Sequence, residues 1–220
     1  LSETTDLVRL DAGRALPQEQ RAKLGQFMTP RAVAQFMASL FRPQPRSIRL
    51  LDAGAGVGSL TAAFVEAVLA SDRPPNRMSI DAWELDGALA PYLEQTLTRC
   101  GAHCTDRGVT WQSVVHQRDF LSDGAEMLDR TFFAQPIRTF NAAIVNPPYH
   151  KIRSDSDARL SMRRIGLETT NLYTAFLAVV ADLLEPGGEM VAITPRSFCN
   201  GPYFRPFRER FLSSMTLLRL

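Results

Sequence analysis

Strand-like and helix-like segments alternate along most of this chain, and this alternation constrains its fold more than any other feature. Apolar runs typical of strands occupy residues 47–55, 78–86, 109–120, 140–146 and 189–195. Helical spacing of apolar residues occupies residues 59–70, 87–100, 171–188 and 203–215, with a polar helical stretch at 126–130. Strands separated by helices pair in parallel through right-handed crossovers. The sequence therefore predicts an α/β fold, a doubly wound and mostly parallel sheet with helices on both faces.

The first part of the chain has helical patterns and precedes every predicted strand. Within it, residues 29–41 form a predicted helix that Thr29 can cap, with a proline in its first turn. We expect an N-terminal helical segment at residues 1–45 and a sheet domain at residues 46–220. Residues 216–220 are again strand-like, so we expect the native chain to continue beyond them.

Composition bounds the class of protein. The 220 residues, 45% of them hydrophobic, suffice for one sizeable core. No apolar run approaches the roughly 18 residues of a membrane span, and the charged first residues are unlike a secretory signal, so we predict a cytoplasmic protein. A net charge of +2 does not by itself indicate a nucleic-acid partner. Three cysteines lack metal-ligand spacing, so we expect packed thiols and no metal site: Cys100, Cys104 and Cys199.

A glycine-rich loop joins the first predicted strand to its helix. The segment "LLDAGAGVGSL" contains Asp52, Gly54, Gly56 and Gly58. Glycines let the backbone turn tightly and approach a ligand, and the helix that follows offers unpaired N–H groups. The spacing departs from the Gly-x-Gly-x-x-Gly dinucleotide fingerprint, and tight turns of this kind also occur without a ligand. Its place in the first crossover favours a nucleotide-like ligand at the carboxyl edge of the sheet.

Acidic and aromatic residues lie at the ends of the next two predicted strands. Glu84 could accept hydrogen bonds from both hydroxyls of a ribose, or it could be a surface acid. Asp86 is the better candidate for capping the next helix. Asp119 could accept a hydrogen bond from an adenine amino group, and Phe120 could stack on its ring. Three such groups at successive strand ends indicate a binding site more strongly than any one of them.

The fourth predicted strand ends in "NPPY" and is followed by a basic run. Two prolines make residues 146–149 a rigid polar tip, which could be a functional loop or only a strand terminator. Residues 150–164 then set five Lys and Arg residues against two Asp residues. We interpret this run either as a solvated, mobile loop or as a segment that contacts phosphates.

Taken together, these motifs resemble the class I S-adenosylmethionine-dependent methyltransferases. The combination is similar to the N6-adenine DNA methyltransferases of restriction-modification systems: "GQFMTP" at 25–30, "DAGAGVG" at 52–58, Glu84, Asp119-Phe120 and "NPPY" at 146–149. Because "GQFMTP" precedes the glycine loop and "NPPY" follows it, the order resembles the gamma subgroup and its Eco57I-type branch. The resemblance implies a Rossmann-like sheet and an enzyme.

The resemblance also implies the ligands and their sites. The cofactor would be S-adenosyl-L-methionine, held by Phe27, Thr29, Asp52, Gly54, Gly56, Gly58, Glu84, Asp119 and Phe120. Thr29 would lie near its methionine carboxylate and Glu84 at its ribose. The target base would contact Asn146, Pro147, Pro148 and Tyr149. Basic residues would contact double-stranded DNA whose adenine is flipped out, namely Lys151, Arg153, Arg163 and Arg164. A restriction endonuclease, fused or separate, is a further candidate partner.

In this interpretation "NPPY" acts by accepting hydrogen bonds. The Asn146 side-chain oxygen and the Pro147 carbonyl would each accept an N–H of the target amine and favour a nitrogen lone pair aimed at the methyl group. His150 is then a loop residue, since the chemistry requires no strong base. Related enzymes carry a final hairpin and a target-recognition domain, so we expect this chain alone to be inactive. The alternatives are a protein glutamine or ribosomal RNA methyltransferase, and a non-catalytic binding module.

Overall fold

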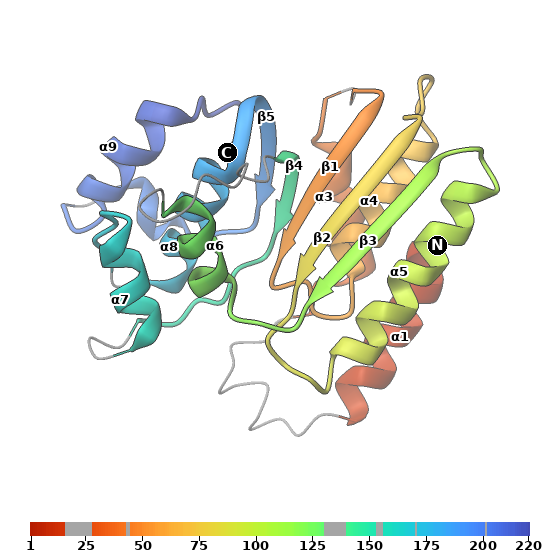
Figure 1. Cartoon of the computed structure of the whole chain (residues 1–220), viewed down its shortest axis with the longest axis horizontal. Coiled ribbons are helices and arrows are strands. Elements are labelled where there is room, and N and C mark those ends of the chain that lie inside the picture. Colours follow the sequence, from red (N-terminus) through yellow and green to blue (C-terminus); the bar gives the residue numbers. More distant parts are fainter. Residues whose placement is uncertain (16–27, 43–44, 130–139, 153–155, 170, 201) are drawn as a thin grey trace.

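A computed structural model describes residues 1–15, 28–42, 45–129, 140–152, 156–169, 171–200 and 202–220. In these ranges the chain forms a five-stranded sheet with the order β3-β2-β1-β4-β5, and every neighbouring pair is parallel (Figure 1). The strands are β1 (Ser47–Ala53), β2 (Arg77–Trp83), β3 (Thr110–His116), β4 (Phe140–Val145) and β5 (Leu184–Ala192). The predicted doubly wound parallel sheet is confirmed.

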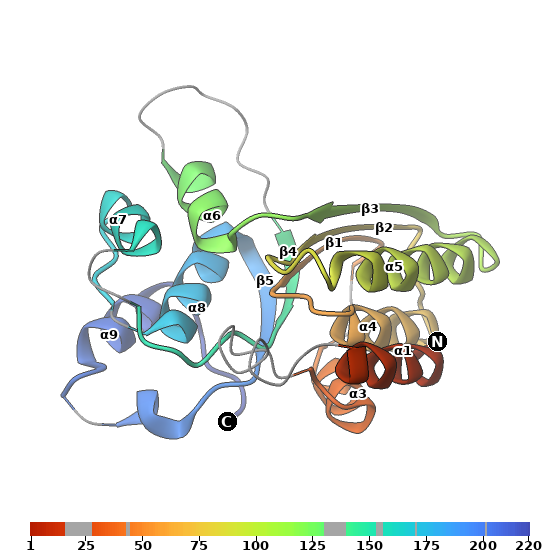
Figure 2. The same cartoon turned by 90° about the horizontal axis from the view of Figure 1, so that it is seen from below.

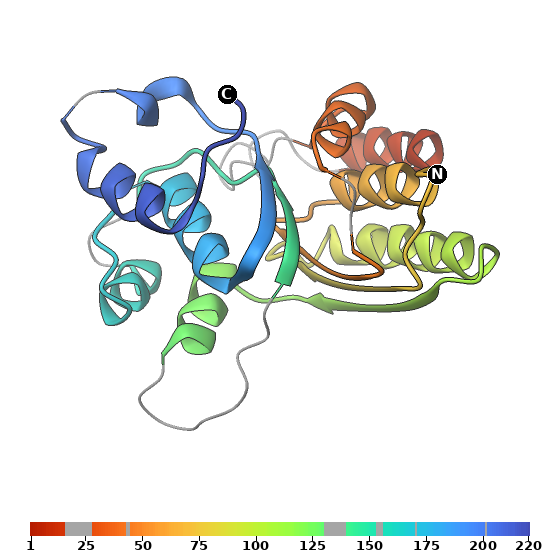
Figure 3. The ribbon, with the colours of Figure 1, turned by 90° about the horizontal axis from the view of Figure 1, so that it is seen from above.

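Helices cover the sheet from two sides (Figures 2 and 3). One group lies on the β1–β2 side, and comprises α3 (Arg31–Ser39), α4 (Ser59–Leu69), α5 (Ala90–Thr105) and α1 (Ser2–Ala15), which packs on the other three helices. The other lies around β4 and β5, and comprises α6 (Phe120–Leu128), α7 (Asp157–Arg164), α8 (Leu172–Leu183) and α9 (Arg205–Ser214). A short 3₁₀ helix, η1 (Arg196–Cys199), follows β5. The N-terminal helices therefore pack directly on the sheet domain, and the division at residue 45 stays a prediction.

Alternation along β1 divides the core into two layers. Ile48 and Leu50 belong to the cluster with α4, whereas Leu51 and Ala53 belong to the cluster with α8. Successive side chains of a strand point to opposite faces, so a strand covered on both faces is apolar throughout. All four residues are fully buried, and each large one contributes roughly 1.5–3 kcal/mol of transfer free energy.

Several predicted boundaries were wrong. Helix α6 begins at Phe120 instead of near residue 126, because Asp119 caps it by accepting from the Ser122 amide at 2.8 Å. Helix α8 ends at Leu183, and residues 184–188 already belong to β5 with a shift of register against β4. Residues 216–220 were predicted as a strand but lie exposed and unpaired with the sheet.

The basic run was predicted as a loop, but residues 157–164 form α7. Ser156 caps this helix by accepting from the Arg159 amide, and Met162 anchors it in the core. The cap, the buried methionine and the ion pairs of Arg159 and Arg163 with Glu168 hold this short helix, which packs on α6.

The cysteine prediction is confirmed in part. Cys100 and Cys104 are buried free thiols on one face of α5, whereas Cys199 is exposed. Burial raises the pKa of the Cys104 thiol to about 11, so this group stays protonated at neutral pH. Among the described residues no group of His, Cys, Asp and Glu could hold a metal ion. Nor does any helix within the described ranges reach the length and apolarity that a membrane span needs.

Candidate functional site

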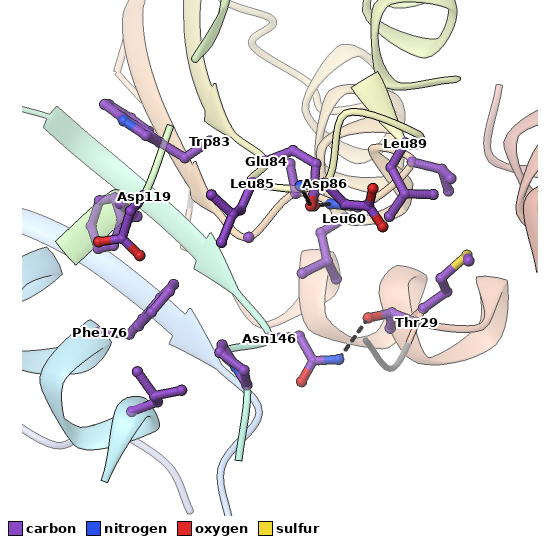
Figure 4. A pocket seen from close by; sticks show the side chains of 18 of the residues that line it. Thr29, Leu60, Trp83, Glu84, Leu85, Asp86, Leu89, Asp119, Asn146 and Phe176 are labelled. Carbon is purple, nitrogen blue, oxygen red and sulfur yellow. Dashed lines mark hydrogen bonds between the residues drawn. The ribbon is translucent and has the colours of Figure 1, made fainter. Parts of the chain in front are cut away.

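A cavity of about 350 Å³ opens at the carboxyl edge of the sheet, where β1, β2 and β4 end (Figure 4). Its volume lies within the range of small-molecule sites, and the carboxyl edge is where open α/β sheets bind ligands. Backbone and side chains of the glycine loop, the β2 and β3 ends, α8 and the segments around residues 29 and 148 form its wall. The described lining residues are Met28, Thr29, Gly54, Ala55, Gly56, Val57, Ser59, Leu60, Trp83, Glu84, Leu85, Asp86, Leu89, Arg118, Asp119, Phe120, Asn146, Pro148, His150, Lys151, Leu172 and Phe176.

The three glycines of the loop have different structural roles. Gly54 and Gly56 line the cavity, and both have positive φ, at 77° and 58°. A Cβ on Gly56 would meet nothing within 4 Å, so the backbone is open to a ligand there. Gly58 does not line the cavity: at φ 82° it precedes α4, and a Cβ would come within 3.0 Å of Thr96 on α5. The structure brings two of the three predicted glycines to the cavity and uses the third for helix packing.

Glu84 lies at the centre of the cavity wall between two loops. Its Oε2 accepts from the Gly56 amide and its Oε1 from the Asp86 amide, both at 2.8 Å. The side chain is only 6% exposed, and this burial raises the pKa of the carboxyl, although the two backbone N–H groups oppose the shift. Each carboxylate oxygen has two lone pairs, so each can still accept a hydrogen bond from a ligand hydroxyl.

Asp86 and Asp119 line the cavity and also accept hydrogen bonds from backbone amides. Asp86 lines the cavity and accepts from the Ala88 amide at 2.9 Å. It therefore closes the turn before α5 and does not cap α5 itself, whose cap position is Leu89. Asp119 caps α6 and also lines the cavity, so its second carboxylate oxygen can face a ligand.

Phe120 was predicted as a stacking platform and is almost fully buried. Its ring lies between Trp83, with centroids 5.4 Å apart, and Phe176, with centroids 5.1 Å apart. Phe120 therefore presents little ring area to the cavity, and its stacking on a base stays a prediction.

Several apolar residues in the wall were missed in the sequence, and two of them face the centre of the cavity. Leu85 is 57% exposed and points into the cavity, and Phe176 on α8 faces it from the opposite side (Figure 4). A leucine that faces an open cavity between acidic neighbours is suited to one face of a flat ring. Leu85 could have been predicted from the sequence, because it directly follows Glu84 at the end of a strand. Phe176 had no local signal, because helix α8 is apolar on most sides.

Asn146 follows β4 and lies across the cavity from Glu84 (Figure 4). Its Nδ2 donates to Thr29 Oγ1 at 3.1 Å, and its Oδ1 accepts from the Tyr149 hydroxyl at 2.7 Å. Thr29 was predicted to cap α3, but Pro30 occupies the cap position and that helix has no side-chain cap. The Thr29 hydroxyl contacts the Asn146 amide instead.

The remaining residues of "NPPY" differ in their exposure to the cavity. Pro148 lines the cavity, whereas Pro147 is buried behind it. Tyr149 is half-buried, and its hydroxyl points toward Asn146. Burial raises the pKa of Tyr149, so the phenol remains a hydrogen-bond donor at neutral pH. The structure does not bring the Tyr149 ring to the cavity wall.

Of the described residues that were predicted to contact DNA, Lys151 lines the cavity, whereas Arg163 and Arg164 do not, and their phosphate contacts stay a prediction. Lys151 and His150 line the cavity, and the Leu172 amide donates to the His150 carbonyl at 2.9 Å. On α7, Arg163 lies 3.3 Å from Glu168, whereas Arg164 is exposed and makes no ion pair among the described residues. Two predicted site residues, Phe27 and Arg153, lie outside the described residues.

Asp52 lies behind the glycine loop and does not line the cavity. Its side chain lies on the same face of β1 as Ile48 and Leu50, and this face packs against α4. There its Oδ2 accepts from Thr61 Oγ1 at 2.6 Å. Its Oδ1 is buried and has no hydrogen-bond partner within the described part of the chain. Loss of hydration raises the pKa of Asp52 to about 7, against the lowering effect of the Thr61 hydroxyl. The position of Asp52 does not support its predicted contact with a ligand.

The raised pKa of Asp52 predicts a pH-dependent stability. Between its ordinary pKa of 3.8 and about 7, the folded state binds a proton that the unfolded state does not, so stability falls as pH rises through this window. Asp52→Asn keeps the acceptor for Thr61 and cannot titrate. From pH 5 to 8, the unfolding free energy of the variant should rise relative to the native protein by on the order of 2 kcal/mol. Urea denaturation at both pH values measures the difference, and parallel pH curves would contradict the prediction.

A model of the family described as Eco57I restriction-modification methylase matches residues 93–220, more than half of the chain. The matched region includes β3, β4 and "NPPY" with its link to the cavity. The chain belongs to the Eco57I restriction-modification methylase family. The predicted Eco57I-type branch is confirmed.

Curated relatives of this Eco57I-family chain are named as type II methyltransferases. The chain is 40% identical over 220 residues to the type II methyltransferase M.PstI of Providencia stuartii, which covers 100% of the chain and 42% of that protein. It is 39% identical over 218 residues to M.BsuBI of Bacillus subtilis, with 98% of the chain and 42% of that protein covered. The chain thus spans less than half the length of these relatives.

Solved structures share the fold of this Eco57I-family chain. A protein described as a class I S-adenosylmethionine-dependent methyltransferase from Listeria monocytogenes aligns with a TM-score of 0.60 at 14% identity, over 84% of this chain and 52% of that one. The methyltransferase subunit of a type I restriction-modification system from Streptococcus thermophilus aligns with a TM-score of 0.59 at 23% identity, over 85% of this chain and 38% of that one. At these identities the likeness shows a common Rossmann-like fold.

Proposed function

We propose that this chain carries the cofactor and target sites of an S-adenosylmethionine-dependent methyltransferase that acts on the N6 amino group of adenine in DNA. The observation that carries the proposal is that Asn146 and Glu84 face the same cavity from different strand ends. One side of the cavity offers a carboxylate suited to a ribose, and the other offers an amide suited to an amine. Family membership and the names of the relatives support this assignment.

The cofactor end of the cavity fits the proposed ligand. Glu84 is held by two backbone amides and retains acceptor capacity for two ribose hydroxyls. Gly56 leaves open space where a side chain would block a ligand, and Leu85 offers an apolar face beside Asp119. When bound, S-adenosylmethionine supplies a methyl group activated by its sulfonium charge. Three acids line the cavity, Glu84, Asp86 and Asp119, against the two basic residues Arg118 and Lys151, and this excess of acids favours a positively charged ligand.

At the target end, the Asn146 side-chain oxygen accepts one N–H of the amine, and the Pro147 carbonyl is the proposed second acceptor, although Pro147 is buried and does not line the cavity. An exocyclic adenine nitrogen is a poor nucleophile because its lone pair is delocalised into the ring. Two fixed acceptors favour a pyramidal nitrogen with an available lone pair, and the prolines hold both in place. Positioning of the amine therefore supplies most of the rate acceleration, and His150 is not needed as a base. An adenine must leave the duplex to enter a cavity of this kind.

We further propose that Lys151, Arg153, Arg163 and Arg164 contact DNA phosphates. Arg164 is the sharpest test, because it is exposed and makes no ion pair among the described residues. Arg164→Gln in the complete protein should reduce the slope of log affinity against log salt by roughly one. Arg107→Gln is a control, since its guanidinium donates to the Leu69 carbonyl on the opposite helix layer. An unchanged slope in the Arg164 variant would remove α7 from the DNA interface.

The proposed function is tested by transfer of a labelled methyl group. The complete gene product is incubated with S-adenosylmethionine carrying a heavy methyl, separately with duplex DNA, ribosomal RNA and glutamine-containing protein. Mass spectrometry of digested products is expected to find N6-methyladenine from DNA. Label on RNA bases or on glutamine in place of DNA adenine would overturn the proposed substrate, and failure to bind the cofactor in calorimetry would indicate a non-catalytic module.

A further inference from the structure

We propose that Thr29 is a positioning residue that sets the orientation of the Asn146 amide for methyl transfer. The inference rests on the proposed function, because it deepens the role of Asn146 in the target site. It differs from the expectation that Thr29 contacts the methionine carboxylate of the cofactor. The observation that carries it is the hydrogen bond from Asn146 Nδ2 to Thr29 Oγ1, at 3.1 Å across 117 residues of sequence.

An asparagine amide must be oriented before it can act as an acceptor. Its oxygen and nitrogen have nearly the same shape, and rotation of the amide by half a turn would present a donor where the target needs an acceptor. Rotation about this terminal torsion is soft, so neighbouring hydrogen bonds decide which end faces which way. Partners on both ends of the amide are therefore required to fix it.

Asn146 has such a partner at each end. The Tyr149 hydroxyl donates to Oδ1 at 2.7 Å, and Thr29 Oγ1 accepts from Nδ2 at 3.1 Å. The Ile193 carbonyl, at 3.4 Å from the Tyr149 oxygen, is a second and more distant acceptor for the phenol proton. The shorter contact directs the phenol proton to Asn146. An amide oxygen has two lone pairs, so it can accept from a target amine while it accepts from Tyr149.

Burial makes the Thr29 contact effective. Thr29 is 6% exposed although it lines the cavity, and it stands one residue before Pro30, the cap position of α3. A hydroxyl fixed by the backbone in a nearly dry position competes with few water molecules for the amide N–H. The hydrogen bond therefore ties the segment before α3 to the tip of β4, and Figure 4 shows the two side chains directed toward each other.

Thr29→Val tests the proposal, because valine keeps the shape and removes the acceptor. In the protein encoded by the complete gene, single-turnover transfer to adenine-containing DNA should slow about five- to tenfold, the size expected for one neutral hydrogen bond. The dissociation constant for S-adenosylmethionine should stay within about twofold, and Thr29→Ser should restore most of the rate. Thr98→Val is the matched control, since the exposed Thr98 hydroxyl donates to the Glu94 carbonyl of its own helix, away from the cavity.

A second variant separates orientation from packing. Tyr149→Phe removes the other partner of the same amide, so its effect and that of Thr29→Val should combine less than additively. Full additivity, or a Thr29→Val protein that transfers methyl groups at the native rate, would overturn the positioning role. Weaker cofactor binding with an unchanged transfer rate would also overturn it and make Thr29 a cofactor contact. Asn146→Ala, measured beside them, separates failure of the positioning role from failure of the proposed function. A native transfer rate in that variant would contradict the proposed function itself.

Discussion

Asn146→Ala is expected to slow methyl transfer by about a hundredfold or more while leaving cofactor affinity nearly unchanged. The amide lies at the end of β4, across the cavity from Glu84, and contacts Thr29 and Tyr149 but none of the groups assigned to the ribose. Removing one preorganised hydrogen-bonding group from a transition state has a cost of this size. A loss confined to the transfer step would place Asn146 in the chemistry, because uniform binding effects appear in affinity instead.

The measurement is single-turnover methyl transfer beside a calorimetric cofactor titration of the same protein. Asn76→Ala is the control, since Asn76 lies at the opposite end of the sheet and its Oδ1 accepts from Arg46. Thermal unfolding of both variants shows whether the fold is intact. A folded Asn146→Ala protein that methylates at the native rate would leave "NPPY" as a strand terminator.

Glu84→Gln should weaken S-adenosylmethionine binding by on the order of 1.5–3 kcal/mol, through the loss of charge-assisted hydrogen bonds. The structure adds a second cause. Both carboxylate oxygens accept from backbone amides, of Gly56 and Asp86, whereas a glutamine side chain has one acceptor oxygen and can accept from only one of them. The other amide would face a donor, so the glycine loop or the Asp86 turn should also become less ordered.

Calorimetry measures the affinity, and hydrogen exchange at Gly56 and Asp86 measures the local order. Glu94→Gln on the exposed face of α5 is the matched control, since Glu94 lies outside the cavity wall. Native affinity in a folded Glu84→Gln protein would restrict the carboxylate to holding the two loops. Weaker binding with native exchange would assign the whole effect to the ligand contact.

The sequence by itself determined the sheet, its parallel pairing and the edge that carries the site. Hydrophobic periodicity is a local property, and the handedness of crossovers leaves few arrangements for alternating strands and helices. Glu84 and Asn146 follow strands directly, so the carboxyl edge brings them together without further information. Alternation along β1 also predicts the direction of the Asp52 side chain, because every second residue of a strand shares one face and Asp52 therefore lies on the face of Ile48 and Leu50.

Only the tertiary structure decided which neighbours the site residues have. The contact of Thr29 with Asn146 depends on how α3 packs on α4, and no pattern near either residue encodes it. Phe176 reaches the cavity because α8 crosses the sheet at a particular place, whereas its sequence only marks the helix as buried. In the sequence Gly58 cannot be distinguished from Gly54 and Gly56, whereas in the structure α5 occupies the space that a Gly58 side chain would need. Residues far apart in sequence meet through the packing of whole elements, and that packing depends on the summed shape of many side chains rather than on the residues that meet.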